Sequence, residues 1–468
     1  MGRRRRLTQG ASTGMFPLHV RGLACALAML PCICTLPAIA GVAAVARGPS
    51  QALAGPPSRA ATEADIIRLI ERSEAGDVVS LRAASPGIVD RGLGAVVDAS
   101  LAASRLDLPA TRAARRVVEE RRLPPRWRAM TLATEAGVAF ATGDYGLCAR
   151  DSAAWLSLPA ATDPIHLRSD VAQMAAIAAQ LAHLPGQRTD ASPPSTSPTW
   201  RDKAGLVRTQ VRIGGMPQDA VVDTGANLSV VSESAARRLG LATVDGGSVR
   251  SSSRDAVAVR LAVAKRLDIA GTTLSNVAFL VLRDEDLRLP LPGGYDIPAI
   301  VGFPVLRALG RVTFTPTSLT THGDTPPSGL QAPLVASGSS LFVLAEVNGL
   351  GVPLHLDSGA SATSLDKRFA AEHPDVVRGL ETRSTRSAGA GGAVEGRAHV
   401  LRDAVIEIGG VGTSLPAVDI ETSSPSSSNE AGNFGTLGQD VLRSAGGSYT
   451  IDFGRMTLSI SRAARLSR

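Results

Sequence analysis

Two stretches of the chain repeat one pattern, and this repeat decides the fold. The first, Ile213–Ala226, reads IGGMPQDAVVDTGA, and the second, Val347–Ala360, reads VNGLGVPLHLDSGA. They align without a gap, so that Asp223 and Asp357 take the same place, each after apolar residues and before a hydroxyl residue and a glycine. An apolar run that enters a glycine turn is typical of a buried strand. The repeat therefore predicts two similar β units, each with one aspartate at the end of a buried strand.

Each unit continues with a predicted helix. Ser232 and Asp366 are favourable N-cap residues, because their side chains accept hydrogen bonds from the free N–H groups of a first helical turn. Helices are therefore predicted over Glu233–Leu239 and Lys367–Glu372. A glycine follows the first and a proline follows the second, and either residue ends a helix.

The pattern returns near the end of each unit. Ala299-Ile300-Val301 leads to Gly302 in the first unit and Gly435-Thr436-Leu437 leads to Gly438 in the second, and Val-Leu-Arg follows after the same spacing. A further glycine, Gly310 or Gly446, closes each segment. A short helix that ends at a glycine fits both segments.

These paired motifs resemble those of the aspartic peptidases, which carry Asp-Thr/Ser-Gly after an apolar strand and an apolar-apolar-Gly strand downstream. The units are similar to retropepsins in size, but two are fused in one chain as in pepsin-like enzymes. The resemblance covers about Leu206–Ile460. It implies two acid-protease-type β lobes related by a pseudo-twofold axis, over residues 204–316 and 338–462.

The resemblance also implies the chemistry. Peptide hydrolysis needs a base to activate water and an acid to protonate the carbonyl oxygen and the leaving amine. Two carboxyls that share one proton supply both, because like charges about 3 Å apart cannot both ionise, and aspartic proteases are the general example. Asp223 and Asp357 are the candidate catalytic pair, and this mechanism uses no cofactor and no metal. A lone Asp-Thr-Gly is equally an acid that caps its own turn, but that explanation does not account for two matched copies.

The residues after each acid are expected to support the pair. In the family, the hydroxyls at Thr224 and Ser358 bond across to the opposite lobe, and Gly225 and Gly359 let each turn approach its partner. The next residue is alanine in both copies, where pepsin-like sites usually carry a hydroxyl that stabilises the ionised carboxylate. The pair should therefore keep its shared proton to a higher pH, with a mildly acidic to near-neutral optimum.

Lobes of this family also contain a hairpin, called the flap, that closes over the substrate. The candidate flap in the second lobe contains Gly389, Gly391 and Gly392, and its counterpart in the first lobe is Asp245–Arg254. A flexible loop is the alternative for both segments. Neither carries the tyrosine of a pepsin-like flap, and Tyr295 lies elsewhere.

The N-terminal half has a different pattern. Residues 60–187 are rich in Ala, Leu and Arg at helical spacing and predict an all-α domain, either tetratricopeptide-like or of no nameable family. Within it Cys148 is interpreted as a small buried hydrophobe. Two stretches rich in Pro and Ser, Asp190–Pro198 and Thr315–Ser340, are predicted to be linkers. The fold class expected is thus a helical domain followed by a mainly β half.

The start of the chain predicts export. Gly22–Ala46 carries no charge, follows a run of arginines and contains small-residue cleavage sites, as a signal peptide does. Residues 1–46 are therefore a signal peptide of a periplasmic or secreted protein, or alternatively an inner-membrane anchor. Cys148 is the only cysteine beyond this segment, which excludes an intrachain disulfide in a processed chain.

Composition and charge limit the classes of binding partner that are expected. The net charge of +7 owes five positive charges to arginines that precede the apolar run, and aromatic residues are only 3%, so a nucleic-acid partner has little support. The seven histidines are scattered without metal-binding spacing. The expected partner is a peptide or unfolded protein substrate, with a further protein partner for the helical domain. Two rival functions stay open, a non-catalytic peptide-binding module and a helical scaffold with ligand-sensing lobes.

Overall fold

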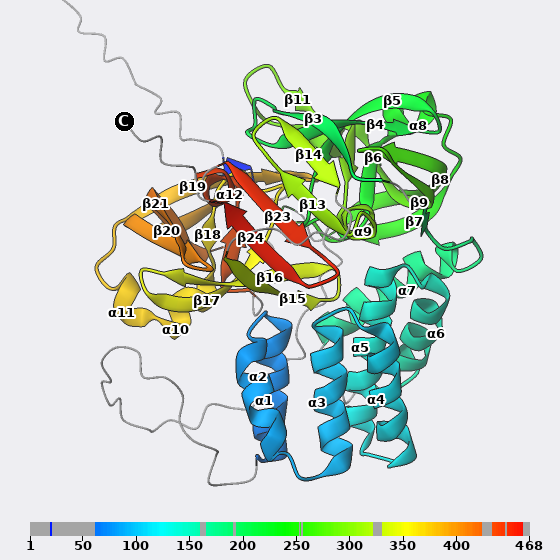
Figure 1. The fold of residues 1–468 in the computed structure, drawn as a ribbon, viewed down its shortest axis with the longest axis vertical. Helices are drawn as coiled ribbons and strands as arrows, with labels where there is room; N and C mark the ends of the chain where they lie inside the picture. The colour runs from blue at the N-terminus through cyan, green and yellow to red at the C-terminus, as the bar shows by residue number, and fades with distance from the viewer. Residues whose placement is uncertain are drawn as a thin grey trace, which may run out of the picture.

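The computed structural model describes residues 19–20, 61–159, 165–190, 193–251, 253, 256–321, 330–423, 433–444 and 447–461. A helical domain lies beneath two β lobes, the first in green and the second in yellow to red (Figure 1). The predicted fold class, a helical domain followed by a mainly β half, is confirmed. The predicted leader falls outside the described residues except for His19–Val20, which pair in parallel with Ser387–Ala388.

The helical domain consists of seven helices and a short 3-10 turn within the described residues. They are α1 (Glu63–Glu74), α2 (Val78–Ala84), α3 (Arg91–Ala103), α4 (Leu108–Glu120), α5 (Pro125–Thr142), α6 (Tyr145–Leu156) and α7 (Ile165–Leu181). The caps explain the boundaries. Thr62 and Asp65 form a capping box at the start of α1, and Gly143, in the left-handed region at φ +83°, ends α5. Cys148 is buried in this domain, as interpreted from the sequence.

The two lobes repeat one topology, and its centre is the strand that leads to each aspartate. In the first lobe β5 (Met216–Val222) pairs in parallel with β12 (Ala299–Val301), which also pairs antiparallel with β6 (Ser229–Ser232). In the second lobe β17 (Leu350–Leu356), β22 (Gly435–Leu437) and β18 (Ser364–Leu365) are arranged in the same way. Each acid therefore follows a strand, β5 or β17, whose parallel neighbour, β12 or β22, separates it from the third strand.

Further elements complete each lobe. In the first lobe they are β2 (Arg188–Thr189), β4 (Val207–Ile213), α8 (Glu233–Arg238), β7 (Thr243–Val249), β8 (Val257–Ile269), β9 (Thr272–Leu282), η3 (Asp284–Leu287), β10 (Arg288–Leu289), β11 (Tyr295–Asp296) and α9 (Phe303–Ala308). In the second they are β16 (Ser340–Val347), α10 (Lys367–Glu372), α11 (Pro374–Val377), β19 (Thr382–Gly389), β20 (Gly392–Ile408), β21 (Val411–Ser423) and α12 (Gln439–Ser444). The predicted helices match α8 and α10 closely, and α9 and α12 follow Gly302 and Gly438 as expected. Gly446 lies outside the described residues.

A six-stranded antiparallel sheet joins the lobes. Its order is β3 (Ser195–Arg201), β14 (Ser318–Thr321), β13 (Arg311–Phe314), β23 (Ser448–Asp452), β24 (Thr457–Ser461) and β15 (Gln331–Ser337). The prediction of linkers over Asp190–Pro198 and Thr315–Ser340 is therefore wrong in part, because β3, β14 and β15 begin or lie within them. Each lobe contributes three strands, which makes the junction pseudo-symmetric.

The middle of this sheet holds the two lobes together. Arg311 of β13 forms a buried ion pair with Asp452 of β23, with Nη2 and Oδ2 2.7 Å apart. Phe314 stacks on Tyr449 with ring centroids 4.7 Å apart. A charged pair and an aromatic pair between neighbouring strands supply both register and burial.

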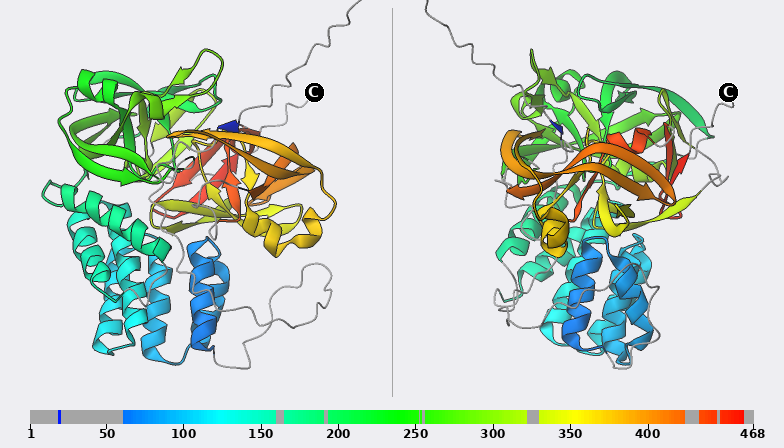
Figure 2. Two further views of the ribbon diagram at one scale, coloured as in Figure 1. Left: turned by 180° about the vertical axis from the view of Figure 1, so that it is seen from behind. Right: turned by 90° about the vertical axis from the view of Figure 1, so that its left-hand side faces the viewer.

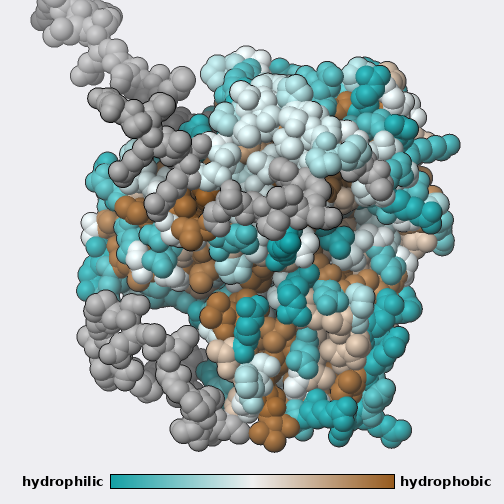
Figure 3. Space-filling view, in the orientation of Figure 1, coloured by the Kyte–Doolittle hydropathy of each residue, from teal (hydrophilic) through white to brown (hydrophobic). Residues whose placement is uncertain are grey.

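The helical domain contacts both lobes. Helix α7 packs against β7 of the first lobe, and residues of α5, α6 and α7 share a hydrophobic cluster with β7 and β8. On the second lobe, Phe342 of β16 packs under Gly76, where an added Cβ would lie 2.6 Å from the Phe342 side chain. Figure 2 shows the helices beneath the two lobes from two further directions. Figure 3 shows hydrophobic residues, in brown, at the level where the helices meet the β half and also along the helices. None of the helices in the described residues is long and apolar enough to cross a membrane.

Candidate active site

The structure brings Asp223 and Asp357 together between the lobes. Asp223 is fully buried and Asp357 is 4% exposed. Each carboxyl accepts a hydrogen bond from the glycine N–H two residues on, Gly225 N to Asp223 Oδ1 and Gly359 N to Asp357 Oδ1, both at 2.8 Å. Each turn therefore fixes its own acid by a local bond, because the glycine N–H points back to the carboxyl.

The two glycines bring each turn against the opposite acid. An added Cβ on Gly225 would lie 2.8 Å from Cγ of Asp357, and one on Gly359 would lie 2.3 Å from Cγ of Asp223. No carbon fits at such distances, so only glycine lets the turns approach this closely. The glycines predicted from the sequence thus bring each turn up to the acid of the other lobe.

The two hydroxyl residues tie the turns together across the lobes. Thr224 Oγ1 donates to the carbonyl of Leu356 at 2.8 Å and accepts the N–H of Ser358 at 2.9 Å. Ser358 Oγ donates to the carbonyl of Val222 at 2.9 Å and accepts the N–H of Thr224 at 3.0 Å. These four reciprocal bonds are buried, and each satisfies a backbone group of the opposite lobe.

Burial favours the protonated form of the carboxyl pair. Asp223 Oδ2 is buried and has no hydrogen-bond partner among the described residues. Two buried carboxyls that face each other do not both ionise readily, because their negative charges repel. Burial raises the pKa of Asp223, against backbone hydrogen bonds that lower it. Burial also raises the pKa of Asp357, and the charge of Asp223 adds to this effect.

The predicted flap glycines lie at a hairpin tip. Strands β19 and β20 pair up to Gly389 and Gly392, with Gly391 in the turn. This tip reaches the first lobe, where Gly391 N donates to the carbonyl of Asp286 at 2.7 Å and Ser253 Oγ donates to that of Ala390 at 2.6 Å. Ser253 follows β7 in the counterpart hairpin β7–β8, so the two hairpins meet at their ends.

His355, two residues before Asp357, and Tyr295 each have aromatic or charged neighbours of their own. His355 of β17 packs against Phe342 with ring centroids 5.6 Å apart, and burial lowers its pKa to about 4. Tyr295 lies beside Lys203 and Arg208, whose cationic groups are 4.8 and 5.1 Å from its ring centroid.

Sequence reasoning missed two residues of α12 that hold the second turn. Asp440 is the second residue of α12, and its carboxylate accepts hydrogen bonds from N and Oγ1 of Thr363. Gln439 Nε2 donates to the carbonyl of Ser358 at 2.9 Å. A polar residue directly after the apolar-apolar-Gly strand was the available signal, because Phe303 holds this position in the first lobe.

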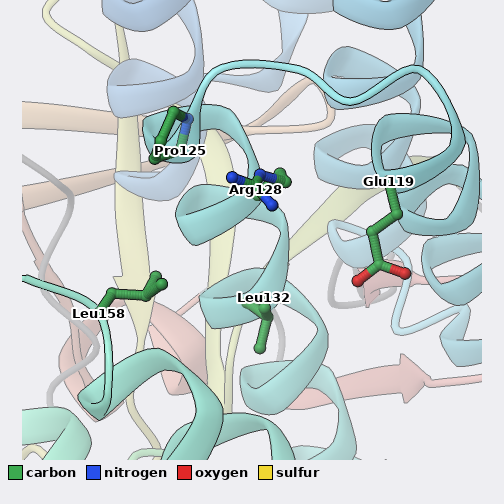
Figure 4. Close-up of a pocket in the computed structure, with 5 residues that line it drawn as sticks. All are labelled: Glu119, Pro125, Arg128, Leu132 and Leu158. Atoms are coloured by element: carbon green, nitrogen blue, oxygen red, sulfur yellow. The ribbon is translucent and has the colours of Figure 1, made fainter.

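A separate pocket lies in the helical domain. It has a volume of about 320 Å³ and is lined by Glu119, Pro125, Arg128, Leu132 and Leu158 (Figure 4). These residues come from α4, α5 and the turn after α6, and none of them belongs to the acid pair. Within the described residues, no three His, Cys, Asp or Glu side chains gather as a metal site.

Comparison with known proteins gives one family. Residues 209–305 and 343–441 each match the model of a family described as aspartyl protease. The first matched region contains Asp223 and the second contains Asp357, and the two regions correspond to the two lobes. A sequence comparison with curated proteins found no match.

Proposed function

Because the two β lobes of this chain belong to the aspartyl protease family, we propose that it is an aspartic endopeptidase whose catalytic pair is Asp223 and Asp357. One observation carries the proposal. Each glycine turn lies against the acid of the other lobe, so that both buried carboxyls face one site between the lobes. An acid that merely caps its own turn needs no partner in the opposite lobe.

The reaction follows from one proton on two carboxyls. The ionised carboxyl accepts a proton from a water molecule, whose oxygen attacks the peptide carbonyl carbon. The protonated carboxyl gives its proton to the carbonyl oxygen, and a tetrahedral diol forms. The carboxyl that took the proton from water then gives it to the leaving nitrogen. As the C–N bond breaks, a hydroxyl of the diol gives its proton to the other carboxyl, so the products are a carboxylic acid and an amine and the pair again holds one proton. Thr224 and Ser358 hold the two turns in register throughout.

The surroundings support an extended peptide or an unfolded protein as substrate. The hairpins β7–β8 and β19–β20 meet at their tips, through Ser253 Oγ to Ala390 O. A substrate peptide bound in extended form between the hairpins and the acids can form strand-like backbone hydrogen bonds with the protein. We also propose that the protein is exported through residues 1–46, by cleavage or as an anchored form, and that the helical domain serves a protein partner.

The test is digestion of an unfolded protein from pH 3 to pH 8, with and without a statine inhibitor. Asp223→Asn and Asp357→Asn should each lower the rate at least about 100-fold, because each removes one member of the acid–base pair. Asp219→Asn is the matched control, since Asp219 is an exposed residue of the same strand β5. It should leave the rate unchanged.

The rival functions predict different outcomes. A peptide-binding module would bind the unfolded protein equally well in all four proteins and cleave it in none. Near wild-type hydrolysis by a pure Asp223→Asn or Asp357→Asn protein would overturn the assignment of the pair.

A further inference from the structure

A chain of hydrogen bonds runs from the first lobe to the second acid. Arg201 Nη1, at the end of β3, donates to Oε1 of Gln439 at 3.0 Å. Gln439 Nε2 donates to the carbonyl of Ser358 at 2.9 Å, and the Gln439 side chain is buried, with the residue 1% exposed. The next N–H in this chain is that of Gly359, which donates to Asp357 Oδ1 at 2.8 Å.

The last two bonds belong to one peptide group. The carbonyl of Ser358 and the N–H of Gly359 are joined by the same C–N bond, so a donor on the carbonyl strengthens the N–H as a donor. Every group in the chain donates in the same direction, from the guanidinium of Arg201 to the carboxyl of Asp357. Such aligned bonds stabilise negative charge at the carboxyl end.

The residue equivalent to Gln439 differs in the first lobe. Its peptide between Thr224 and Gly225 donates to Asp223 in the same way, but the residue after Gly302 is Phe303, whose side chain has no N–H. The hydrogen bond from Gln439 therefore acts on Asp357 alone, in an otherwise symmetric pair.

We propose that Gln439 is a positioning residue, which, held by Arg201, orients and polarises the Ser358–Gly359 peptide so that the acid pair ionises more readily. This inference rests on the proposed function for its kinetic consequence and on geometry alone for its effect on proton affinity. Without the chain, the N–H of Gly359 is a weaker donor, the ionised pair is less stable, and both limbs of the pH–rate profile move to higher pH.

Other charged and titratable groups lie near this chain of hydrogen bonds, and the variants used in the test leave them unchanged. Around Arg201 and Gln439 they are Asp202, Tyr449 and Arg443, with Asp440 next along α12. Around the acids they are the acids themselves and His355, two residues before Asp357 on β17.

The experiment titrates the carboxyl carbons of protein labelled with ¹³C at aspartate, with Asp357→Asn and Asp223→Asn to assign the pair, and measures the pH–rate profile in parallel. Gln439→Met should raise the titration midpoint by about 0.5–1 pH unit, a roughly 3- to 10-fold change in proton affinity. Arg201→Met should raise it less, and Arg201→Lys, which keeps the charge, less again. The double variant Arg201→Met with Gln439→Met should equal Gln439→Met, because both changes break one chain.

Thr363→Val is the matched control. It loosens the contact between α12 and the second turn, because Thr363 Oγ1 donates to Asp440, but it leaves the bond to Ser358 in place. It should lower stability without moving the midpoint. An unmoved midpoint in both Gln439→Met and Arg201→Met, or an equal shift in Thr363→Val, overturns the proposal. Should Gln439→Met fail to fold, Arg201→Met decides. The carbon titration responds even where no hydrolysis is found, so failure of the proposed function is seen separately.

Discussion

Thr224→Val keeps the shape of the side chain and removes its hydroxyl, which tests the bonds that join the lobes. The hydroxyl makes two buried bonds, to the carbonyl of Leu356 and from the N–H of Ser358. Their loss leaves a buried carbonyl and a buried N–H unsatisfied, and each such group costs about 1–3 kcal/mol. We expect the free energy of unfolding to fall by about 2–5 kcal/mol, a large part of the roughly 5–15 kcal/mol of a typical protein.

Ser358→Ala should have a similar effect, since its hydroxyl also makes two buried bonds across the lobes. The two hydroxyls share no bond with each other, so independent losses would add. However, both hold the same pair of turns, and we expect the double variant to lose about 1 kcal/mol less than the sum. The activity should fall with stability in all three variants, because the turns also carry the acids.

The midpoint of urea unfolding at pH 7 and the rate of peptide hydrolysis measure both effects. Thr196→Val is the control, since Thr196 belongs to the same interlobe sheet but shares an exposed hydroxyl contact with Thr320. It should cost less than about 0.5 kcal/mol. A cost for Thr224→Val no greater than for Thr196→Val would refute the assignment of the interlobe bonds as a main stabilising contact.

Three further predictions concern pH and assembly. Because burial raises the pKa of both acids above their unfolded values, the folded state binds more protons than the unfolded state, and stability is lost as pH rises from about 4 through the folded values. Asp357→Asn should therefore raise the free energy of unfolding by about 1–3 kcal/mol at pH 7 and by little at pH 4. Thermal unfolding at pH 7 and at pH 4 measures this difference, and an equal increase in stability at both pH values would contradict the prediction. Ala226→Ser combined with Ala360→Ser should move the pH–rate profile towards acid, by adding hydroxyl donors to the ionised pair, and a static profile would assign the pKa to burial alone. Activity per molecule should stay constant on dilution with one chain per particle by sedimentation, because the Arg311–Asp452 pair joins the lobes within one chain; activity that disappears with a dimer would count against this.

The local features of the site follow from the sequence. Asp223 and Asp357 could be found from apolar strands that enter glycine turns, because alternation and turn chemistry act over a few residues. Helix α8 follows from its N-cap residue for the same reason, since Ser232 accepts a hydrogen bond from Ala235 N. Helix α10 begins after Asp366 as expected, but the Asp366 side chain makes no capping hydrogen bond. The internal repeat made these local signals strong, since two copies of one pattern are far less expected by chance than one.

The interlobe sheet was misread for a physical reason. Its two outer strands, β3 and β15, contain Pro198 and Pro333, and both have a composition that is typical of linkers. Neither strand is an edge along its whole length, because β3 also pairs with β4 and β15 with β16. These second pairings begin at Thr199 and Leu334, so each proline lies where its strand has a partner on one side only. Strand formation there depends on the partner strands and not on the composition of the segment itself.

The sequence by itself determined the two acids, their glycines and hydroxyls, the flanking strands and helices, and the division into a helical and a β half. The bonds of the Thr224 and Ser358 hydroxyls across the lobes were implied by the family resemblance, and the structure contains them. Only the packing of the lobes decided that the hairpin tips meet and that Arg201 reaches Ser358 through Gln439. These contacts join residues at least 81 positions apart. No pattern within a few residues encodes such a pair, because its distance is set by how whole strands and lobes pack.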